Sequence, residues 1–537
     1  MQEQQPQQPQ QRNPINPIKN IKAYLGYQGY SIFKDTLTVE EQHALRKELT
    51  VGAYIPKSPI QPTPFPIYRE SPLKIYVPRY FGLEKWAGIQ VESKITPGHA
   101  ISLKFMGDLR DYQQVIVEKY LKAARNVGIG AAAAIGGGGL LDVDPGKGKT
   151  VMALKIIECL AMKTLVVVHK SFLSNQWKER IEQFLPGARV GIIQGQLIDI
   201  DNKDIVIAMV QSLSMKEYPQ STFESFGLTI FDECHHMGAE VFSRCMMKVT
   251  TTYTLGLSGT MQRKDGLSKV FKMFLGDVVH KEKAESDHCV LVKGINYVVD
   301  DDEFNEVEYD YRGNPKFSTM ISKLCNYNRR SEFIVEVVAK ELQHNADQQI
   351  MILAHNKSLI QYLFKAIEHR KIATVGYYLG GMKEADLKAS ESKKIIIATY
   401  AMASEGLDIK TLTTLIMATP KTDVCQSVGR ILRVKHTTPV VIDIVDAHDL
   451  FKNQWQKRKS YYKKQNYRII VTDSGLYHSN ETNGCWTTAY NPKKIKGAVA
   501  VVSTGISSDD DDDEETGAVT KSNSNRKQPI LNGKCFL

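Results

Sequence analysis

The residues best suited to phosphate chemistry are Gly146, Gly148, Lys149 and Thr150, at the end of a glycine-punctuated stretch. Glycines let backbone N–H groups converge on a polyphosphate, and the first turn of a following helix adds a favourable dipole. A lysine in this position reaches the terminal phosphates, and the next hydroxyl binds Mg²⁺. We therefore expect a phosphate-binding loop, although Val143 stands where the full motif has its first glycine, which leaves an ordinary glycine-rich turn as the alternative.

Two adjacent carboxylates, Asp232 and Glu233, follow the apolar run 228–231. The carboxyl ends of parallel strands meet at one edge of a sheet, so we expect both side chains to face the same crevice as Lys149. Asp232 is suited to hold the Mg²⁺ that bridges two phosphates, and Glu233 is suited to orient and deprotonate an attacking water.

Further candidate residues are spread along the chain. The hydroxyls of Ser258 and Thr260 can bond the acidic pair and any element that moves above it. The Gln113 amide offers the donor and the acceptor that the edge of adenine requires. Arg430 and Arg433 lie three residues apart, so a helix would place both on one face, where they can neutralise phosphates held by another domain. A solvated helix face is the alternative for these two arginines.

These residues need strands that end at a common edge, and the chain supplies them. Short apolar, β-branched runs alternate with helical patterns such as 151–160, which is typical of parallel sheets covered on both faces. We predict an α/β fold with two tandem parallel sheets. The predicted strands are 164–168, 190–193, 204–208, 228–232 and 254–257 in the first sheet, and 350–353, 374–377, 395–398, 415–417 and 440–444 in the second.

The domain plan follows from shifts in composition. We predict a disordered Gln/Pro-rich tail at 1–20, a small β-rich accessory domain, two α/β domains joined by a β-rich connector, and a largely disordered C-terminal tail. The accessory domain spans 21–104, the α/β domains span 105–280 and 326–475, the connector is 281–325, and the tail is 476–537. A flexible loop is expected at the glycine run 128–139.

Aromatic residues of the accessory domain allow two interpretations. They can stack on bases or fill a small core, and core packing is the favoured one. They are Tyr68, Tyr76, Tyr80, Phe81 and Trp86.

Composition narrows the class of protein. The 537 residues carry a formal net charge of +10 despite the acidic run 509–515, which favours a polyanionic partner. The 8 cysteines form no CxxC pair, which fits a reducing compartment.

A metal cluster of Cys234, His235 and His236 with Cys245 is disfavoured, because adjacent residues at a strand exit cannot all turn to one ion. No apolar run is long enough for a membrane span or a secretion signal, so we expect a cytoplasmic or nuclear protein that is not secreted.

The order of the motifs is more specific than any one of them. The chain resembles the superfamily 2 helicases across about residues 105 to 470, on motifs at 110–113, 146–150, 232–235, 258–260, 403–408 and 426–433. Within that superfamily, the stretches 145–150 and 258–266 are most similar to the XPB and UvsW branch. The stretches 415–420 and 461–464 also resemble helicases of large cytoplasmic DNA viruses, including the poxvirus transcript-release helicase.

This resemblance implies two RecA-like domains that close on ATP and Mg²⁺ while nucleic acid crosses both. It implies that Gln113 recognises adenine, that Lys149, Thr150, Asp232 and Glu233 act on the phosphates, metal and water, and that Ser258 and Thr260 couple hydrolysis to motion. It further places Gly406, Asp408, Gln426, Arg430 and Arg433 at the interdomain site. The chain departs from the family pattern at Val143, Gly259 and Met261, which puts coupling efficiency in doubt and leaves ATP binding intact.

The same resemblance suggests a nucleic-acid track. In the first domain it comprises His169, Lys170, Ser171, Gln211, Ser212 and Leu213, and in the second His355, Asn356, Thr399 and Tyr400. The basic, aromatic segment 452–468 either extends this track or is an ordinary surface helix. DNA is the favoured partner, with the transcription machinery as a further one.

The leading hypothesis is an ATP-dependent DNA helicase or translocase in viral transcription, repair or recombination, located, if viral, in the host cytoplasm or virion. An RNA helicase and an ATP-gated nucleic-acid clamp that does not unwind are the alternatives. A small-molecule kinase is a less favoured hypothesis, because such an enzyme needs no second α/β domain.

Overall fold

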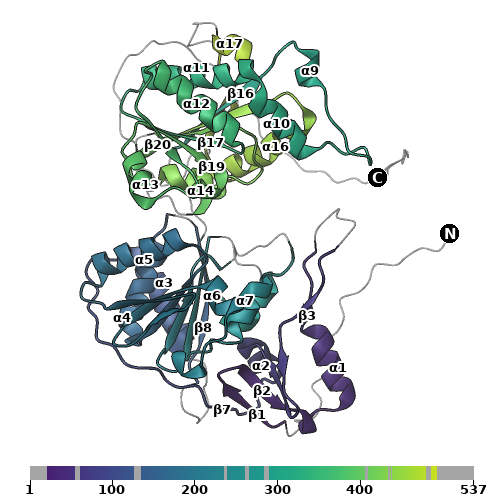
Figure 1. Cartoon of the computed structure of the whole chain (residues 1–537), viewed down its shortest axis with the longest axis vertical. Helices are drawn as coiled ribbons and strands as arrows, with labels where there is room; N and C mark the ends of the chain where they lie inside the picture. The colour runs from purple at the N-terminus through teal and green to yellow at the C-terminus, as the bar shows by residue number, and fades with distance from the viewer. Residues whose placement is uncertain are drawn as a thin grey trace, which may run out of the picture. The chain divides into compact units, whose positions relative to one another are not determined.

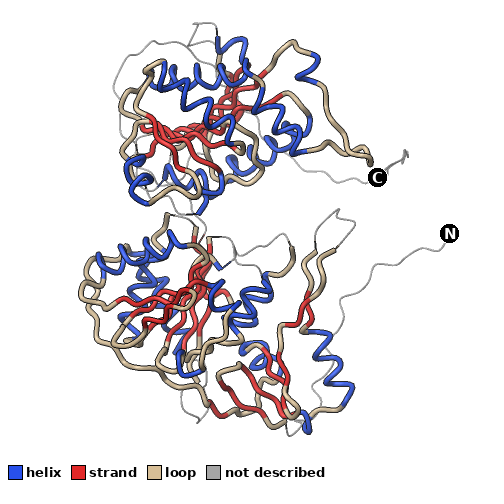
Figure 2. The backbone as a smooth tube through the Cα atoms, in the orientation of Figure 1, coloured by secondary structure: helices blue, strands red, loops and turns tan. Residues whose placement is uncertain are grey.

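The computed structural model describes residues 21–54, 61–125, 135–144, 146–234, 239–259, 265–282, 289–405, 409–432, 436, 438–478 and 485–492. The strands in these residues form one five-stranded sheet, two eight-stranded sheets and a two-stranded ribbon. Figure 2 shows the two large sheets in red with blue helices on both faces. The predicted α/β class with a β-rich N-terminal domain is confirmed. The tail at 1–20 and the acidic run at 509–515 lie outside the described residues.

The first large sheet has the strand order β11-β10-β12-β9-β13-β14-β8-β15 and is parallel except where β10 meets β11. All residues of β8, β9 and β13 are buried, which explains why their sequences are mostly apolar. The strands are β8 (Gly138–Val143), β9 (Thr164–Val168), β10 (Val190–Gln194), β11 (Leu197–Asp199), β12 (Ile205–Met209), β13 (Leu228–Phe231), β14 (Tyr253–Ser258) and β15 (Val278–Glu282).

Helices cover both faces of this sheet (Figure 1). One face carries α3 (Asp111–Arg125), α4 (Lys149–Leu160) and α5 (Ser171–Phe184), and the other carries α6 (Val210–Met215), α7 (Ala239–Met246) and α8 (Ser268–Leu275). Successive residues of β9 alternate between the two cores, with Val166 and Val168 in one and Leu165 and Val167 in the other. This alternation also determines toward which face of the sheet the side chain of the residue after each strand points.

The strand that leads into the phosphate loop starts earlier than expected. Gly138 and Gly139 were predicted to belong to a flexible loop, but they are the first two residues of β8. A Cβ on Gly138 would lie 2.1 Å from the Thr254 carbonyl oxygen, and one on Gly139 would lie 2.2 Å from Val279. Glycine is therefore required because neighbouring strands approach closely here. Residues 128–134 of the predicted loop lie outside the described residues.

The second large sheet has the order β18-β19-β17-β20-β21-β16-β22-β23 and is parallel except where β22 meets β23. Its strand β16 falls in the predicted connector, yet it pairs with β21 and β22 inside the sheet. Its strand β23 falls in the predicted C-terminal tail. The strands are β16 (Leu291–Tyr297), β17 (Gln349–Ala354), β18 (Val375–Tyr378), β19 (Ile395–Thr399), β20 (Leu412–Met417), β21 (Val440–Asp446), β22 (Arg468–Asp473) and β23 (Thr487–Tyr490).

The helices of the second domain also form two layers. They are α9 (Asp302–Asn305), α10 (Phe317–Asn326), α11 (Asn328–His344), α12 (Lys357–His369) and α17 (Ser474–His478) with one core, and α13 (Glu384–Glu391), α14 (Tyr400–Glu405), α15 (Cys425–Val428) and α16 (Asp449–Lys464) toward the other. Two buried ion pairs fasten helices to β21: Arg330 with Asp446 at 2.5 Å, and Arg458 with Asp443 at 2.6 Å. In α16 the side chains of Trp455 and Tyr462 point into the core.

The accessory domain contains a sheet of order β5-β6-β2-β1-β7. Its Phe81 is buried, and its Trp86 stacks on Tyr30 with ring centroids 5.5 Å apart, so core packing is confirmed for Phe81 and Trp86, whereas Tyr76 lies on the other face of the sheet. Among the described residues, no helix is long and apolar enough to cross a membrane. The elements are β1 (Ala23–Gly26), β2 (Gly29–Phe33), α1 (Val39–Glu48), β3 (Thr50–Val51), β4 (Phe65–Pro66), β5 (Arg69–Glu70), β6 (Lys74–Val77), α2 (Arg79–Lys85) and β7 (Glu92–Ser93).

Candidate active site

The phosphate loop connects β8 to α4, as the sequence predicts. Gly146 and Gly148 both have a positive φ, at 84° and 81°, and α4 begins at Lys149. The positive φ of Gly148 favours glycine, and a Cβ there would lie 2.4 Å from the Nε2 atom of Gln113 and displace that amide. The backbone N–H groups at the start of α4 are thus available for an anion.

Lys149 and Glu233 meet across the edge of the sheet. The Lys149 ammonium lies 3.0 Å from Oε1 of Glu233 and donates to the Val143 carbonyl at 3.3 Å. Glu233 has a φ of 46°, in the left-handed region, which costs a residue with a Cβ about 1 kcal/mol. This turn directs the Glu233 side chain back over the phosphate loop. Both side chains line one cleft, which is the arrangement expected from the strand exits.

Asp232 is buried beside this pair and is held by a tryptophan. The Trp177 indole Nε1 donates a hydrogen bond of 2.8 Å to Oδ2 of Asp232. Burial, reinforced by the charge of Glu233, raises the pKa of Asp232 above its usual range. Trp177 is a residue of the site that none of the sequence motifs indicated. A fully buried indole N–H needs an acceptor, which is the signal that could have identified it.

Gln113 is bonded within the protein. Its Nε2 donates to the Lys147 carbonyl at 2.9 Å, and its Oε1 accepts from the Arg110 backbone N–H at 3.0 Å. The Tyr112 hydroxyl donates to the same Lys147 carbonyl at 3.1 Å. In this structure the Arg-x-Tyr-Gln segment therefore supports the phosphate loop directly.

The arginine motif of the second domain does not form one continuous helix. Helix α15 is followed by the 3-10 helix η4 (Gly429–Leu432), which contains Arg430. The buried Arg430 donates from Nε to the Ala403 carbonyl at 2.6 Å. Arg433, Thr260, Gly406 and Asp408 lie outside the described residues, as does the side chain of Gln426.

A cleft of about 1030 Å³ brings many of the predicted residues together. It is bordered by α5 of the first domain and α13 of the second, which also bond each other through Asn175 and Glu384 at 2.8 Å and through Glu179 and Lys388 at 3.1 Å. Ser258 is completely buried and does not line it. The predicted residues that line the cleft are Gly146, Gly148, Lys149, Thr150, His169, Ser171, Asp232, Glu233 and Arg430.

In the first domain, the predicted track residues gather at the strand exits. The Gln211 amide donates to the His169 carbonyl at 2.8 Å, and the Ser212 hydroxyl accepts from the Gly195 N–H at 2.9 Å. Burial lowers the pKa of Lys170. Leu213, in contrast, is completely buried, so its side chain belongs to the core and not to a binding surface.

In the second domain, His355 and Asn356 follow β17, and Thr399 ends β19. His355 Nδ1 lies 2.8 Å from the Thr419 hydroxyl, and Asn356 caps α12 by accepting from the Ser358 N–H at 3.0 Å. The Tyr400 side chain is buried, and its hydroxyl donates to the Thr419 carbonyl at 2.5 Å. Tyr400 therefore belongs to the core that supports this edge of the sheet, and its side chain is not on the binding surface.

Comparison with known proteins bears on both domains. The family described as "Type III restriction enzyme, res subunit" matches residues 106–263. "Putative ATP-dependent RNA helicase L396" of Acanthamoeba polyphaga mimivirus is 36% identical over 448 residues, covering 81% of this chain and 83% of that protein. "Putative helicase 161L" of Invertebrate iridescent virus 6 is 28% identical over 69% of this chain and 85% of that protein.

A solved structure, the crystal structure of T4 UvsW, covers 84% of this chain and 99% of its own at 18% identity and a TM-score of 0.34. The family assignment does not depend on it. It depends on the 36% identity across four-fifths of both chains, together with the order of the motifs and the two parallel-sheet domains. The chain belongs to the superfamily 2 helicases, alongside those of large DNA viruses, and is an ATP-hydrolysing enzyme.

Proposed function

We propose that this helicase uses ATP hydrolysis to move along or unwind DNA, with residues 105–280 and 326–475 as its motor domains and 21–104 as an accessory domain. The observation that carries the proposal is the Lys149–Glu233 pair at 3.0 Å, in a cleft that Arg430 of the second domain also lines. Such an arrangement suits a charged substrate that contacts both domains, so that its hydrolysis changes the contacts of each.

In this proposal, Lys149 exchanges the Glu233 carboxylate for the terminal phosphates of ATP. Glu233, once released, orients and deprotonates the attacking water, and Arg430 and Arg433 offset charge on the phosphates. The N–H groups of the positive-φ loop suit the phosphates, and the buried carboxylate of Asp232 beside the loop is an oxygen ligand that suits a cation. When bound at Thr150 and Asp232, Mg²⁺ would neutralise phosphate charge.

The remaining roles complete the cycle. Gln113 contacts adenine, Gly406, Asp408 and Gln426 contribute to the site when the domains close, and Ser258 with Thr260 couples hydrolysis to motion. Nucleic acid follows His169, Lys170, Gln211 and Ser212, then His355, Asn356 and Thr399. Contacts with the phosphate backbone give affinity without sequence preference and a strong dependence on salt.

DNA is the proposed track, and the biological setting is viral transcription, repair or recombination in the host cytoplasm, the nucleus or the virion, with the transcription machinery as a partner. RNA is the second candidate, because the mimivirus relative is named an RNA helicase. An ATP-gated clamp has the same motifs but no strand displacement.

The experiment is ATP hydrolysis at one low salt concentration, alone and with single-stranded DNA, duplex DNA or single-stranded RNA in turn. Stronger stimulation by DNA than by RNA supports the proposal, and preference for RNA replaces it with the second candidate. Strand displacement, with Lys149→Ala as the inactive control, separates a helicase from a clamp.

A further inference from the structure

The accessory sheet has a second face, opposite its core, on which aromatic and basic side chains alternate. Core residues such as Ile32 and Ile75 are direct partners between β2 and β6, and the residues between them point the other way. The pairing places two rows on this outer face. One row is Lys22, Phe33 and Lys74, and the next is Tyr24, Ser31, Tyr76 and Arg69.

The rings and cations of these rows are in contact. The ring centroids of Tyr24 and Phe33 are 6.2 Å apart, and the Lys74 ammonium lies 4.9 Å and 4.7 Å from them. Lys94 lies 4.9 Å from the Tyr24 ring on its other flank. Among the described residues, these two rings have ring contacts only with each other and with these two lysines. Tyr24, Phe33 and Lys74 are each half-buried, and the Lys74 ammonium also donates a hydrogen bond of 3.1 Å to the Tyr24 hydroxyl.

The charge of this face favours a polyanion. Lys22, Arg69, Lys74 and Lys94 supply four cations, and Glu92, which pairs with Tyr24 in register and lies 3.7 Å from Lys94, supplies an acid. A net positive surface with adjacent aromatic rings suits a strand whose bases stack while its phosphates meet lysine and arginine. Duplex bases are already stacked on one another, so unpaired bases fit better.

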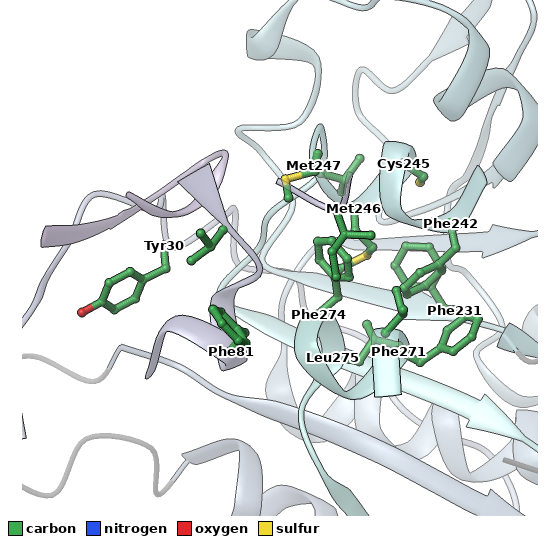
Figure 3. Packing of buried hydrophobic residues seen from close by; sticks show 14 of the residues in the cluster. Tyr30, Phe81, Phe231, Phe242, Cys245, Met246, Met247, Phe271, Phe274 and Leu275 are labelled. Atoms are coloured by element: carbon green, nitrogen blue, oxygen red, sulfur yellow. The ribbon is translucent and has the colours of Figure 1, made fainter. Parts of the chain in front are cut away.

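The accessory domain is attached to the first α/β domain, so a nucleic-acid strand bound to its sheet would stay next to the motor. Arg79 donates hydrogen bonds of 2.8 to 3.1 Å to the carbonyls of Thr251, Thr252, Ile135 and Gly136 in the first α/β domain. One hydrophobic cluster contains residues of both domains, from Tyr30 and Phe81 to Met246 and Phe274 (Figure 3). A nucleic-acid strand bound to the outer face would therefore be attached to the domain that contains the phosphate loop.

We propose that the outer face of the accessory sheet binds single-stranded nucleic acid, with Tyr24, Phe33 and Tyr76 stacking on bases and Lys22, Lys74 and Arg69 contacting phosphates. This site is separate from the track proposed for the motor domains. It requires that the protein act on nucleic acid, and it does not depend on which residues form that track.

The test is fluorescence anisotropy of the nucleotide-free full chain with a labelled single-stranded oligonucleotide, as DNA and as RNA, across a salt series. The double variant Tyr24→Ala with Phe33→Ala should weaken binding about tenfold or more, because both stacking surfaces are lost. Tyr24→Phe should retain binding. Lys74→Glu should weaken binding and flatten the salt dependence, whereas Lys47→Glu, on the exposed face of α1, should change neither.

Two further measurements make the result decisive. ATP hydrolysis without nucleic acid should be unchanged in all four variants, which shows that the motor is folded. Cross-linking of a photoreactive oligonucleotide to the wild type should label peptides containing residues 22–33 or 69–76. Unchanged anisotropy in the alanine variant, or cross-links confined to the motor domains, would overturn the inference. Loss of binding in that variant together with no nucleic-acid-stimulated hydrolysis in the wild type would instead overturn the proposed motor function alone.

Discussion

The Trp177 indole donates a 2.8 Å hydrogen bond to Asp232, and so joins helix α5 to the residue that follows β13. Trp177 belongs to α5, whose start directly follows His169 and Lys170 at the exit of β9. Asp232 follows β13, beside Glu233. A shift of α5 when nucleic acid binds would therefore move the carboxylate assigned to Mg²⁺, with no intervening element. We regard this bond as a direct route for coupling.

Replacing Trp177 with phenylalanine keeps the buried ring and removes its N–H donor. A hydrogen bond to a charged group contributes about 1.5–3 kcal/mol, so the Mg²⁺ concentration for half-maximal ATP hydrolysis should rise about tenfold. Trp455→Phe, also a buried tryptophan but in the second domain, is the matched control. A Mg²⁺ titration that is the same for the wild type and Trp177→Phe would refute this role.

Lys149 and Glu233 should separate binding from hydrolysis. Lys149→Ala removes the cation that faces the phosphates, so ATP affinity and turnover should both be lost. Glu233→Gln should bind ATP and lower turnover by about 100-fold or more, since a general base contributes about 10² to 10⁴. Fluorescent-nucleotide binding and steady-state hydrolysis report the two effects. Lys147→Ala, on the same loop, is the control. Full turnover by Glu233→Gln would show that the base is elsewhere.

Arg430 should act on the rate of hydrolysis more than on the affinity for ATP. Arginines that complete a phosphoryl-transfer site contribute about 10³ or more to kcat, so Arg430→Ala should reduce kcat by that order with a smaller change in KM. Arg329→Ala, at an exposed arginine of α11, serves as the control. Because Arg430 also donates to the Ala403 carbonyl, thermal melting should confirm that the variant is folded. A normal kcat would argue against catalysis across the two domains.

The accessory domain should lose a specific contribution to its stability in acid. Hydrogen bonds from Arg46, followed by Lys34, lower the pKa of Glu70 to about 2. A carboxylate whose pKa falls on folding stabilises the fold fully above its unfolded pKa, near 4.5, and loses that effect as the pH drops toward 2. Glu70→Gln should therefore cost about 1 kcal/mol at pH 7, and this difference should shrink below pH 4.5. Urea unfolding of both proteins at several pH values measures it. A difference that does not vary with pH would exclude this ion pair as its source.

Local patterns in the sequence were sufficient to predict the α/β class, the phosphate loop and the strand exits that carry Asp232 and Glu233. The reason is that a strand buried on both faces is apolar at most positions, and a phosphate loop must place glycines between such a strand and a helix. The parallel arrangement then brings the ends of β8 and β13 to one edge, whatever the details of packing.

Only the tertiary structure could decide which groups meet at that edge. The Trp177–Asp232 bond, the Lys149–Glu233 ion pair and the insertion of β16 between β21 and β22 all join residues far apart in the chain. Periodicity reports whether a residue is buried, but it does not identify the partner against which it packs. The outer face of the accessory sheet shows the same limit, because its rows of rings and cations arise from the register between β1, β2 and β6.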